Sequence, residues 1–210
     1  MGWRDWQTGT KGFDVLILGQ ERSGKTTFYS FLRLRILGKD GQQSQPTIDN
    51  VNSGVFSFEW TTDNGTFGLA FRNVGDRSGQ IGPQEHAKML IRRRPHLTII
   101  VLDITSSEVS NKINDSYKSW FEYFCSYVSD LLINRPKVAK RFDNRPKTML
   151  ILLNKTDLLL PADLEGKVER ATKIVRDTMG LRLTQHLGGR VTYFPILPCS
   201  MVENPKWNGY

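Results

Sequence analysis

Polar and apolar positions follow one another along the chain in an order that predicts strands alternating with helices. Short apolar runs, typical of strands in a buried sheet, lie at 13–18, 97–102, 148–153 and 191–196. Segments with apolar residues at helical spacing lie beside or between these runs, at 27–37, 86–91, 120–131 and 164–179. This alternation predicts an α/β fold, with helices on both faces of a mostly parallel sheet.

Two further strands form a predicted hairpin. Residues 55–60 alternate between polar and apolar, and apolar residues return at 67–71. Between them, Asp63-Asn64-Gly65 is a turn sequence that joins antiparallel strands. We therefore expect a three-layer sandwich whose sheet has six strands, one of them an antiparallel edge strand.

The helix predicted around 120–131 carries a stripe of large apolar residues. They recur every three or four positions, so we interpret the stripe as packing against the core rather than as a binding surface. Its members are Trp120, Tyr123, Phe124, Tyr127 and Leu131.

The first apolar run leads directly into a phosphate-binding motif. Residues 19–26, here called the phosphate loop, have the sequence G-Q-E-R-S-G-K-T and match G-x-x-x-x-G-K-[ST] between a predicted strand and a predicted helix. Glycines let consecutive backbone N–H groups point into a concavity, and the helix N-terminus adds positive potential. We expect Lys25 to reach the outer phosphates and the Thr26 hydroxyl to face Mg²⁺.

A second motif, N-K-T-D at 154–157, directly follows the run at 148–153. The carboxylate of Asp157 can accept hydrogen bonds from N1–H and the exocyclic amino group of guanine, which adenine does not offer. A carboxylate left without donors is costly, so such a pocket rejects the wrong base. Lys155 offers its aliphatic stem to the base and its ammonium to the phosphate loop.

With both motifs in this order, residues 13–201 resemble the Ras-like and Arf-like small GTPases, most closely the Arf-like ones. The resemblance implies a P-loop NTPase fold, a GTP-hydrolysing activity, and GTP or GDP with Mg²⁺ as ligands. Cys199, Ser200 and Met201 resemble the short family motif that touches guanine. The nucleotide contacts implied elsewhere fall on Gly19, Gln20, Glu21, Arg22, Ser23, Gly24, Lys25, Thr26, Thr27, Asn154, Lys155 and Asp157.

The two switch segments of the family have counterparts between the motifs. Thr47, within P-T-I at 46–48, resembles the threonine that senses Mg²⁺ and the γ-phosphate. The sequence D-R-S-G-Q at 76–80 matches D-x-x-G-Q, so Asp76 would hold Mg²⁺ through water, Gly79 would meet the γ-phosphate and Gln80 would orient the attacking water. An alternative register aligns Asn73 with the metal-facing aspartate.

The interior of the phosphate loop departs from the family pattern. Glu21 stands where Ras-like members have glycine and Arf-like members have aspartate, and its side chain would crowd the γ-phosphate and Gln80. We therefore expect slow intrinsic hydrolysis, with Gln80, Lys25 and Thr47 as the catalytic set. We expect Arg22 to face solvent or form a salt bridge; a role as an internal charge stabiliser is the alternative.

Charge and cysteine content indicate the compartment and the kinds of partner that the protein could have. The formal net charge is +8, and basic residues cluster at 92–94 and 135–147. We expect these clusters to form a solvated face; anionic lipid, nucleic acid or an acidic protein are the alternatives. Nucleic acid is the least favoured of them, because the sequence has no basic strand interleaved with aromatic residues. The two cysteines, Cys125 and Cys199, form neither a disulfide framework nor a metal-ligand spacing, which favours a reducing cytosol. No apolar run approaches the length of a membrane span.

We expect an N-terminal extension over residues 1–12 and a single domain over 13–210. The resemblance implies that this domain is a GTPase domain and that it lacks the terminal helix of the family. The sheet surface which that helix would cover indicates a larger polypeptide or a complex.

Three functions remain open. The first is a GTP-hydrolysing switch controlled by regulatory and effector proteins. The second is a nucleotide-binding scaffold or complex subunit with little turnover. The third, an ATP-dependent enzyme, is disfavoured by Asp157.

Overall fold

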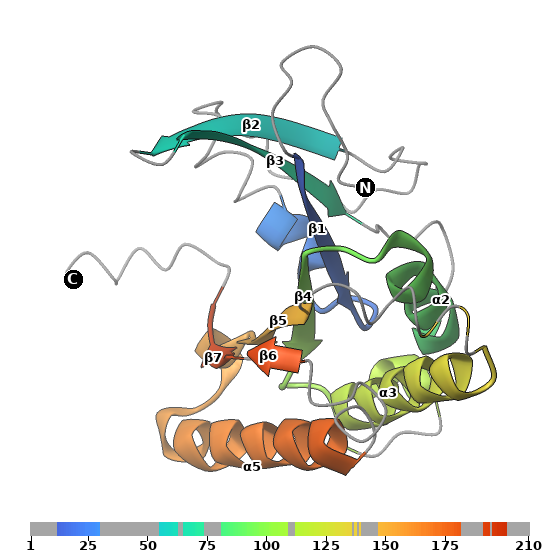
Figure 1. Cartoon of the computed structure of the whole chain (residues 1–210). Coiled ribbons are helices and arrows are strands. Elements are labelled where there is room, and N and C mark those ends of the chain that lie inside the picture. The colour runs from blue at the N-terminus through green and yellow to red at the C-terminus, as the bar shows by residue number, and fades with distance from the viewer. Residues whose placement is uncertain are drawn as a thin grey trace.

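One mixed sheet organises the fold. A computed structural model of the chain describes residues 12–29, 55–62, 65–73, 81–108, 112–135, 137, 139, 147–181, 191–193 and 195–200. The sheet has the strand order β2-β3-β1-β4-β5-β6, and β7 also pairs with β5 (Figure 1). The strands are β1 (Gly12–Gly19), β2 (Val55–Thr62), β3 (Gly65–Asn73), β4 (Leu97–Asp103), β5 (Lys147–Asn154), β6 (Val191–Tyr193) and β7 (Ile196–Pro198).

Neighbouring strands run parallel except at one edge of the sheet. β1 pairs with β3 and β4, and β4 with β5, all in parallel. β2 and β3 pair antiparallel up to Thr62 opposite Gly65, where the sequence predicts the hairpin turn. Among the described residues the sheet has seven strands rather than the predicted six, because the last expected strand is divided into β6 and β7. Pro195 lies between them, and a proline has no N–H for the strand ladder.

Three α-helices are described in full: α2 (Pro83–Arg93), α3 (Tyr117–Ile133) and α5 (Pro161–Met179). Proline in the first turn starts both α2 and α5, because its fixed φ suits the first helical position. This start makes α2 longer than the predicted 86–91. Two 3₁₀ helices, η1 (Ile113–Asp115) and η2 (Thr156–Leu158), precede α3 and α5. Within the described helices, none is long and apolar enough to cross a membrane.

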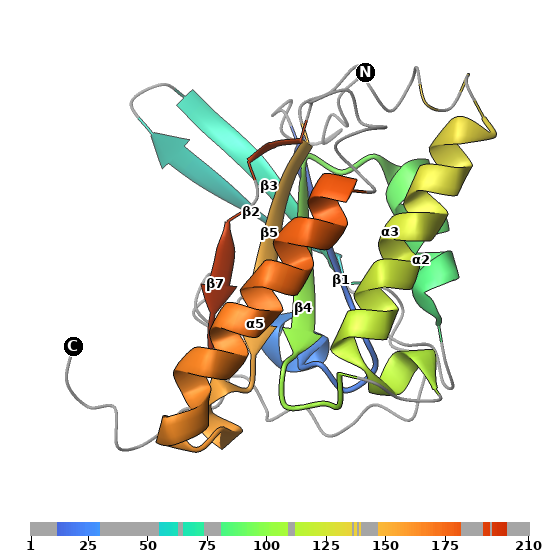
Figure 2. The ribbon, with the colours of Figure 1, turned by 90° about the horizontal axis from the view of Figure 1, so that it is seen from below.

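The two faces of the sheet carry separate cores. On one face, alternate side chains of β1, β4 and β5 pack against α2, α3 and α5, as the arrangement of α3 and α5 in Figure 2 shows. On the other face, Val15, Ile17 and Val101 pack with Tyr29 and Phe28 from the helical residues 25–29 after the phosphate loop. The central strands are therefore apolar on both faces, as their continuous runs predict.

The aromatic stripe of α3 is buried except at one position. Trp120 and Phe124 are fully buried and stack with ring centroids 5.3 Å apart, while Tyr127 and Leu131 pack against the same core. Tyr123 is 46% exposed, so the expectation that it belongs to the core is wrong.

Candidate functional site

The phosphate loop leaves β1 through a glycine that no other residue can replace without strain. Gly19 has φ 150°, and a Cβ built on it would lie 2.1 Å from the carbonyl oxygen of Val101 on β4. Arg22 and Gly24 also have positive φ, at 56° and 95°. These left-handed positions curl the backbone into the kind of turn that presents successive N–H groups to an anion. The helix then begins at Lys25.

The side chains of the loop divide into buried and outward-facing sets. Lys25 is buried, and its ammonium donates to the carbonyl oxygen of Gln20 at 2.5 Å. Ser23 is completely buried, and its hydroxyl has no hydrogen-bond partner among the residues that the structure describes. Thr26 and Glu21 are half-buried. Arg22 is exposed, which agrees with the expected solvent-facing side chain, and so is Thr27 just after the loop.

A buried hydrogen bond joins the two sequence motifs. Asn154, the last residue of β5, donates from Nδ2 to the carbonyl oxygen of Ser23 over 2.8 Å. The asparagine is 2% exposed, so the bond lies within the protein. Because β1 and β5 both flank β4 with the same polarity, their carboxyl ends meet at one edge of the sheet. Motifs that are 131 residues apart in sequence therefore form one site.

Lys155 contacts a residue that the sequence did not indicate. It takes the left-handed conformation, with φ 67°, and its ammonium lies 2.5 Å from Oδ2 of Asp103 at the end of β4. The structure thus places this ammonium on a carboxylate, where we expected the phosphate loop. Asp103 also accepts from the backbone N–H and the hydroxyl of Thr105, at 3.0 and 2.6 Å.

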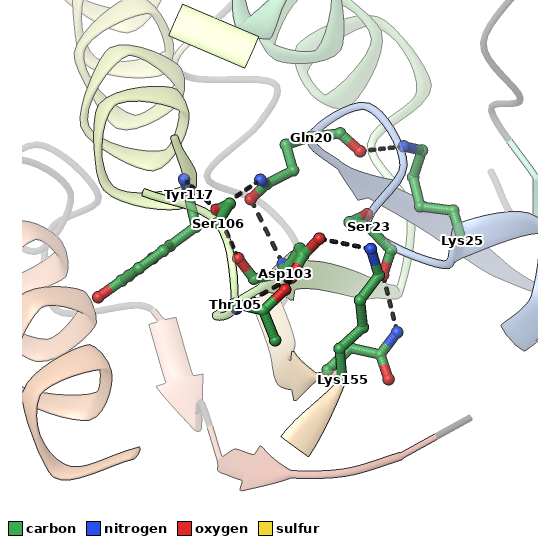
Figure 3. A network of polar contacts seen from close by, with 9 residues as sticks. Gln20, Ser23, Lys25, Asp103, Thr105, Ser106, Tyr117 and Lys155 are labelled. Carbon is green, nitrogen blue, oxygen red and sulfur yellow. Dashed lines mark hydrogen bonds and ion pairs between the residues drawn. The ribbon is translucent and has the colours of Figure 1, made fainter. Parts of the chain in front are cut away.

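Gln20 connects the phosphate loop to the start of α3. Its buried amide donates to the Ser106 hydroxyl at 3.1 Å and accepts from the backbone N–H of Asp103 at 3.4 Å. The Ser106 hydroxyl in turn donates to the carbonyl oxygen of Asp103 and accepts from the N–H of Tyr117 (Figure 3). The loop and the helix are thus linked through the strand end between them.

Sequence reasoning missed Asp103 and Ser106, although a signal was present. Asp103 directly follows the apolar run at 97–102, as Asn154 follows the run at 148–153, and Ser106 comes three residues later. Polar residues just beyond buried parallel strands gather at the ligand-binding edge of an α/β sheet. Applying that rule to each strand would have found them.

The segment after β7 lies against the second motif. The Cys199 carbonyl accepts from the Thr156 hydroxyl at 2.9 Å, and the Cys199 N–H donates to the carbonyl of Leu153. Burial, reinforced by the carboxylate of Asp157, raises the pKa of the Cys199 thiol to about 11. Asp157 and Ser200 are themselves exposed, at the mouth of the site.

One histidine is buried beside the site. His86 on α2 is 0% exposed and meets the Trp120 ring edge-on, with centroids 5.5 Å apart. Within the described part of the chain, both of its ring nitrogens and the indole nitrogen of Trp120 lack hydrogen-bond partners. Burial, and next the ammonium of Lys25, lower the pKa of His86 to about 3. The histidine is therefore neutral at ordinary pH.

Several predicted site residues lie outside the described residues: Thr47, Asp76, Gly79, Gln80 and Met201. β3 ends at Asn73, so Asp76 follows three residues after the strand. Within the described part of the chain, no three His, Cys, Asp or Glu side chains gather in a way that would hold a metal ion. The predicted donor that is described, Thr26, stands at the first turn of the helix after the loop.

Comparisons with known proteins bear on this fold. No protein-family model matches the sequence, and a search of the curated proteins finds no match. Among solved structures, the chain is similar to the signal recognition particle receptor SRb in its GTP complex with SRX from Chaetomium thermophilum. The TM-score is 0.53 at 14% identity, over 91% of this chain and 92% of that one.

The chain is also similar to the Ski7 GTPase-like domain of S. cerevisiae, solved with GDP and inorganic phosphate. Here the TM-score is 0.53 at 17% identity, over 94% of this chain. This chain spans about half the length of the Ski7 structure, at 47%. Together with the phosphate loop at the end of β1, these likenesses give the chain the fold of a P-loop GTPase domain.

Proposed function

We propose that the protein binds guanine nucleotide and hydrolyses GTP as a Mg²⁺-dependent molecular switch. The observation that carries this proposal is the buried hydrogen bond from Asn154 to the carbonyl oxygen of Ser23. It brings a motif suited to phosphates and a motif suited to guanine to one edge of the sheet. A single nucleotide can then contact both.

The base-binding half of the proposal rests on Asp157. Its carboxylate is exposed on η2, directly beyond the ion-paired Lys155. Guanine offers this carboxylate two N–H donors, whereas adenine offers none in the same place. Thr156 fixes the segment by hydrogen bonds to Cys199, which supports the proposal that Cys199 and Ser200 contact a base held by Asp157.

The phosphate-binding half rests on the loop amides and Lys25. The ammonium of Lys25 already lies within the loop, on the carbonyl oxygen of Gln20, and a phosphate chain in the concavity offers it a stronger anionic acceptor. Thr26 stands where its hydroxyl would hold Mg²⁺ together with phosphate oxygens; such sites use few protein ligands. When bound, Mg²⁺ neutralises charge that develops on the transferred phosphoryl group.

For hydrolysis we propose that Gln80 positions the attacking water and that Thr47 and Gly79 meet the γ-phosphate. Asp76 holds a water on the metal, and Asn73 is the alternative for that place. Glu21 slows the intrinsic reaction by crowding the γ-phosphate. A regulatory partner then sets the rate, since an arginine supplied in trans raises it about 10³- to 10⁵-fold.

The two similar structures support a nucleotide ligand. The SRb structure is a GTP complex with SRX, and the Ski7 domain was solved with GDP and inorganic phosphate. We transfer the guanine nucleotide to this chain as a proposal, because Asp157 gives an independent chemical reason for it.

The first experiment measures the affinities of the full chain for GTP, GDP and ATP. We expect guanine nucleotides to bind more tightly than ATP, and Asp157→Ala to reduce that preference. A preference for ATP in the wild type would overturn the guanine assignment. Tight binding of GTP without hydrolysis, even with excess enzyme, would instead favour the scaffold function.

The second experiment follows single-turnover hydrolysis of GTP. Gln80→Ala should slow the reaction, whereas Gln84→Ala, an exposed glutamine on α2, is the matched control and should not. Comparing the Mg²⁺ dependence of Asp76→Ala and Asn73→Ala identifies which residue faces the metal. Unchanged turnover in Gln80→Ala would remove Gln80 from catalysis.

A further inference from the structure

Two basic segments of the sequence converge on one groove. Arg92 lies in the last turn of α2 and Arg94 caps that helix, while Arg135 lies two residues after the last residue of α3, yet all three line a cavity of about 440 Å³ between the two helices. Figures 1 and 2 both show α2 beside α3. We call this cavity the basic groove. The fold, rather than the sequence, brings these charges together.

The basic groove combines charge with an apolar floor. Along α2, Glu85, Lys88, Met89 and Arg92 follow one another at helical spacing and line the groove. Glu85 lies 2.6 Å from Lys88 in an exposed ion pair, so its charge is matched within the groove. The floor contains Met89 and, from α3, Leu131, both of which pack partly on the core.

Helix electrostatics alone do not account for this arrangement. Basic residues in the last turn of α2 offset the negative end of the helix macrodipole, which is sufficient reason for Arg92. The macrodipole gives no reason for a concave, partly apolar surface, nor for a third arginine contributed by the segment just after α3. Arg94 is already satisfied at its backbone, where its N–H caps the carbonyl of Leu90, so its side chain is not needed to end the helix.

The basic groove lies away from the nucleotide site. Arg94 precedes the first residue of β4, whereas the phosphate loop meets β4 near its last residues. With a rise of about 3.3 Å per residue, the length of β4 separates the two by roughly 20 Å. The groove therefore does not belong to the phosphate loop or to the base pocket.

We propose that the basic groove binds an acidic, amphipathic helix of a partner protein. The surface lines about two turns of α2, a length that one helix can follow, and its apolar floor offers anchor positions for side chains at helical spacing. Its four basic side chains, matched by one acidic one, complement glutamate or aspartate on the partner. A membrane surface fits less well, because a flat bilayer would not reach the floor of a concavity.

Fluorescence anisotropy of a model ligand tests the proposal. The probe is a fluorescein-labelled peptide of about 15 residues, with leucine and glutamate at helical spacing, a length at which isolated helices begin to form. Arg92→Glu combined with Arg135→Glu should weaken binding by about tenfold or more, because it places like charges against the peptide. Leu131→Ala should also weaken it. Melting curves verify that each variant folds.

The control variant combines Lys167→Glu with Lys173→Glu. It changes the charge by the same amount on the exposed side of α5. Unchanged binding in this control supports the proposal, and an equal loss in both double variants overturns it, since only net charge would then matter. The proposal also fails if a scrambled peptide binds as well, or if phosphatidylserine vesicles or duplex RNA bind the groove more tightly than the peptide. Measurement without nucleotide keeps these outcomes independent of the GTPase proposal.

Discussion

The ammonium of Lys155 lies 2.5 Å from Oδ2 of Asp103, and the pair joins the ends of two neighbouring strands. Asp103 ends β4 opposite Asn154, the last residue of β5, and Lys155 follows in a left-handed turn. The Asp103 side chain is only 9% exposed, so the pair is partly screened from water. It thereby fixes the direction in which the chain leaves β5 toward Asp157.

Asp103→Asn should weaken both the fold and the site. The substituted amide keeps the shape of the side chain but places a neutral donor or acceptor where Lys155 now meets a carboxylate. A hydrogen bond to a charged partner contributes about 2 kcal/mol, so we expect the free energy of unfolding to fall by about that amount. Guanine-nucleotide affinity should fall about tenfold, as measured by displacement of a fluorescent nucleotide.

The matched control for Asp103→Asn is Glu108→Gln. Glu108 pairs with Arg170 at 3.2 Å, but this pair is largely exposed. Exposed ion pairs contribute at most about 1 kcal/mol. If the two variants lose equal amounts of stability and affinity, the special position of Asp103 is contradicted.

The sequence was sufficient to locate the strands and both nucleotide motifs, because each depends on residues that are neighbours in the chain. Apolar runs marked β1, β4 and β5, and the loop motif has its own glycine spacing. Asp103 and His86 could not be found in that way. Their surroundings depend on which strands and helices become neighbours, and a single strand or helix pattern does not carry that information.

Features set by local geometry could again be predicted from the sequence, whereas features set by tertiary packing could not. Pro83 and Pro161 fix the starts of α2 and α5 by local geometry. Tyr123, in contrast, has the spacing of a core residue but is 46% exposed, so the described part of the fold leaves its side chain largely outside the core. Periodic spacing predicts that a helix has an apolar face. The tertiary arrangement decides how much of that face other elements cover.

Gly19→Ala should strongly destabilise the protein. Its φ of 150° is strained for any residue with a Cβ, and the new methyl group would lie 2.1 Å from the Val101 carbonyl oxygen. Strain of this kind costs about 1–3 kcal/mol before the clash is counted. Gly166→Ala is the control: this glycine lies within α5 with open space around it, and alanine there should stabilise the helix by about 1 kcal/mol. Thermal melting of both variants checks the opposite signs, and a stable Gly19→Ala protein would contradict the loop geometry.

Cys199 should react slowly with alkylating reagents in the folded protein. Its pKa of about 11, against 9.0 for a free thiol, leaves about a hundredfold less thiolate at pH 8. Iodoacetamide labelling followed by mass spectrometry measures the rate at this residue, with the urea-unfolded chain as reference. Asp157→Asn removes the second cause of the shift and should accelerate labelling. Rapid labelling of the native wild type would show that Cys199 is not buried as described.

His86 should make the folded state sensitive to mild acid. Its pKa is about 3 in the folded protein and 6.5 when unperturbed, so between these values the unfolded chain takes up a proton that the folded chain does not. Stability from neutral His86 is therefore complete above pH 6.5 and is lost as the pH falls toward 3. At pH 5 the loss is about 2 kcal/mol.

Urea unfolding of the wild type and His86→Leu, compared at pH 7 and pH 5, isolates the histidine. The carboxylates and the other histidines are common to both proteins, so their contributions cancel in the difference between the two curves. The leucine variant also removes two buried ring nitrogens that have no hydrogen-bond partner among the described residues, and such a replacement is often neutral or stabilising. We expect the stability of His86→Leu relative to wild type to increase by about 2 kcal/mol between pH 7 and pH 5. Parallel pH profiles would mean that His86 is protonated, or reaches solvent, in the folded protein.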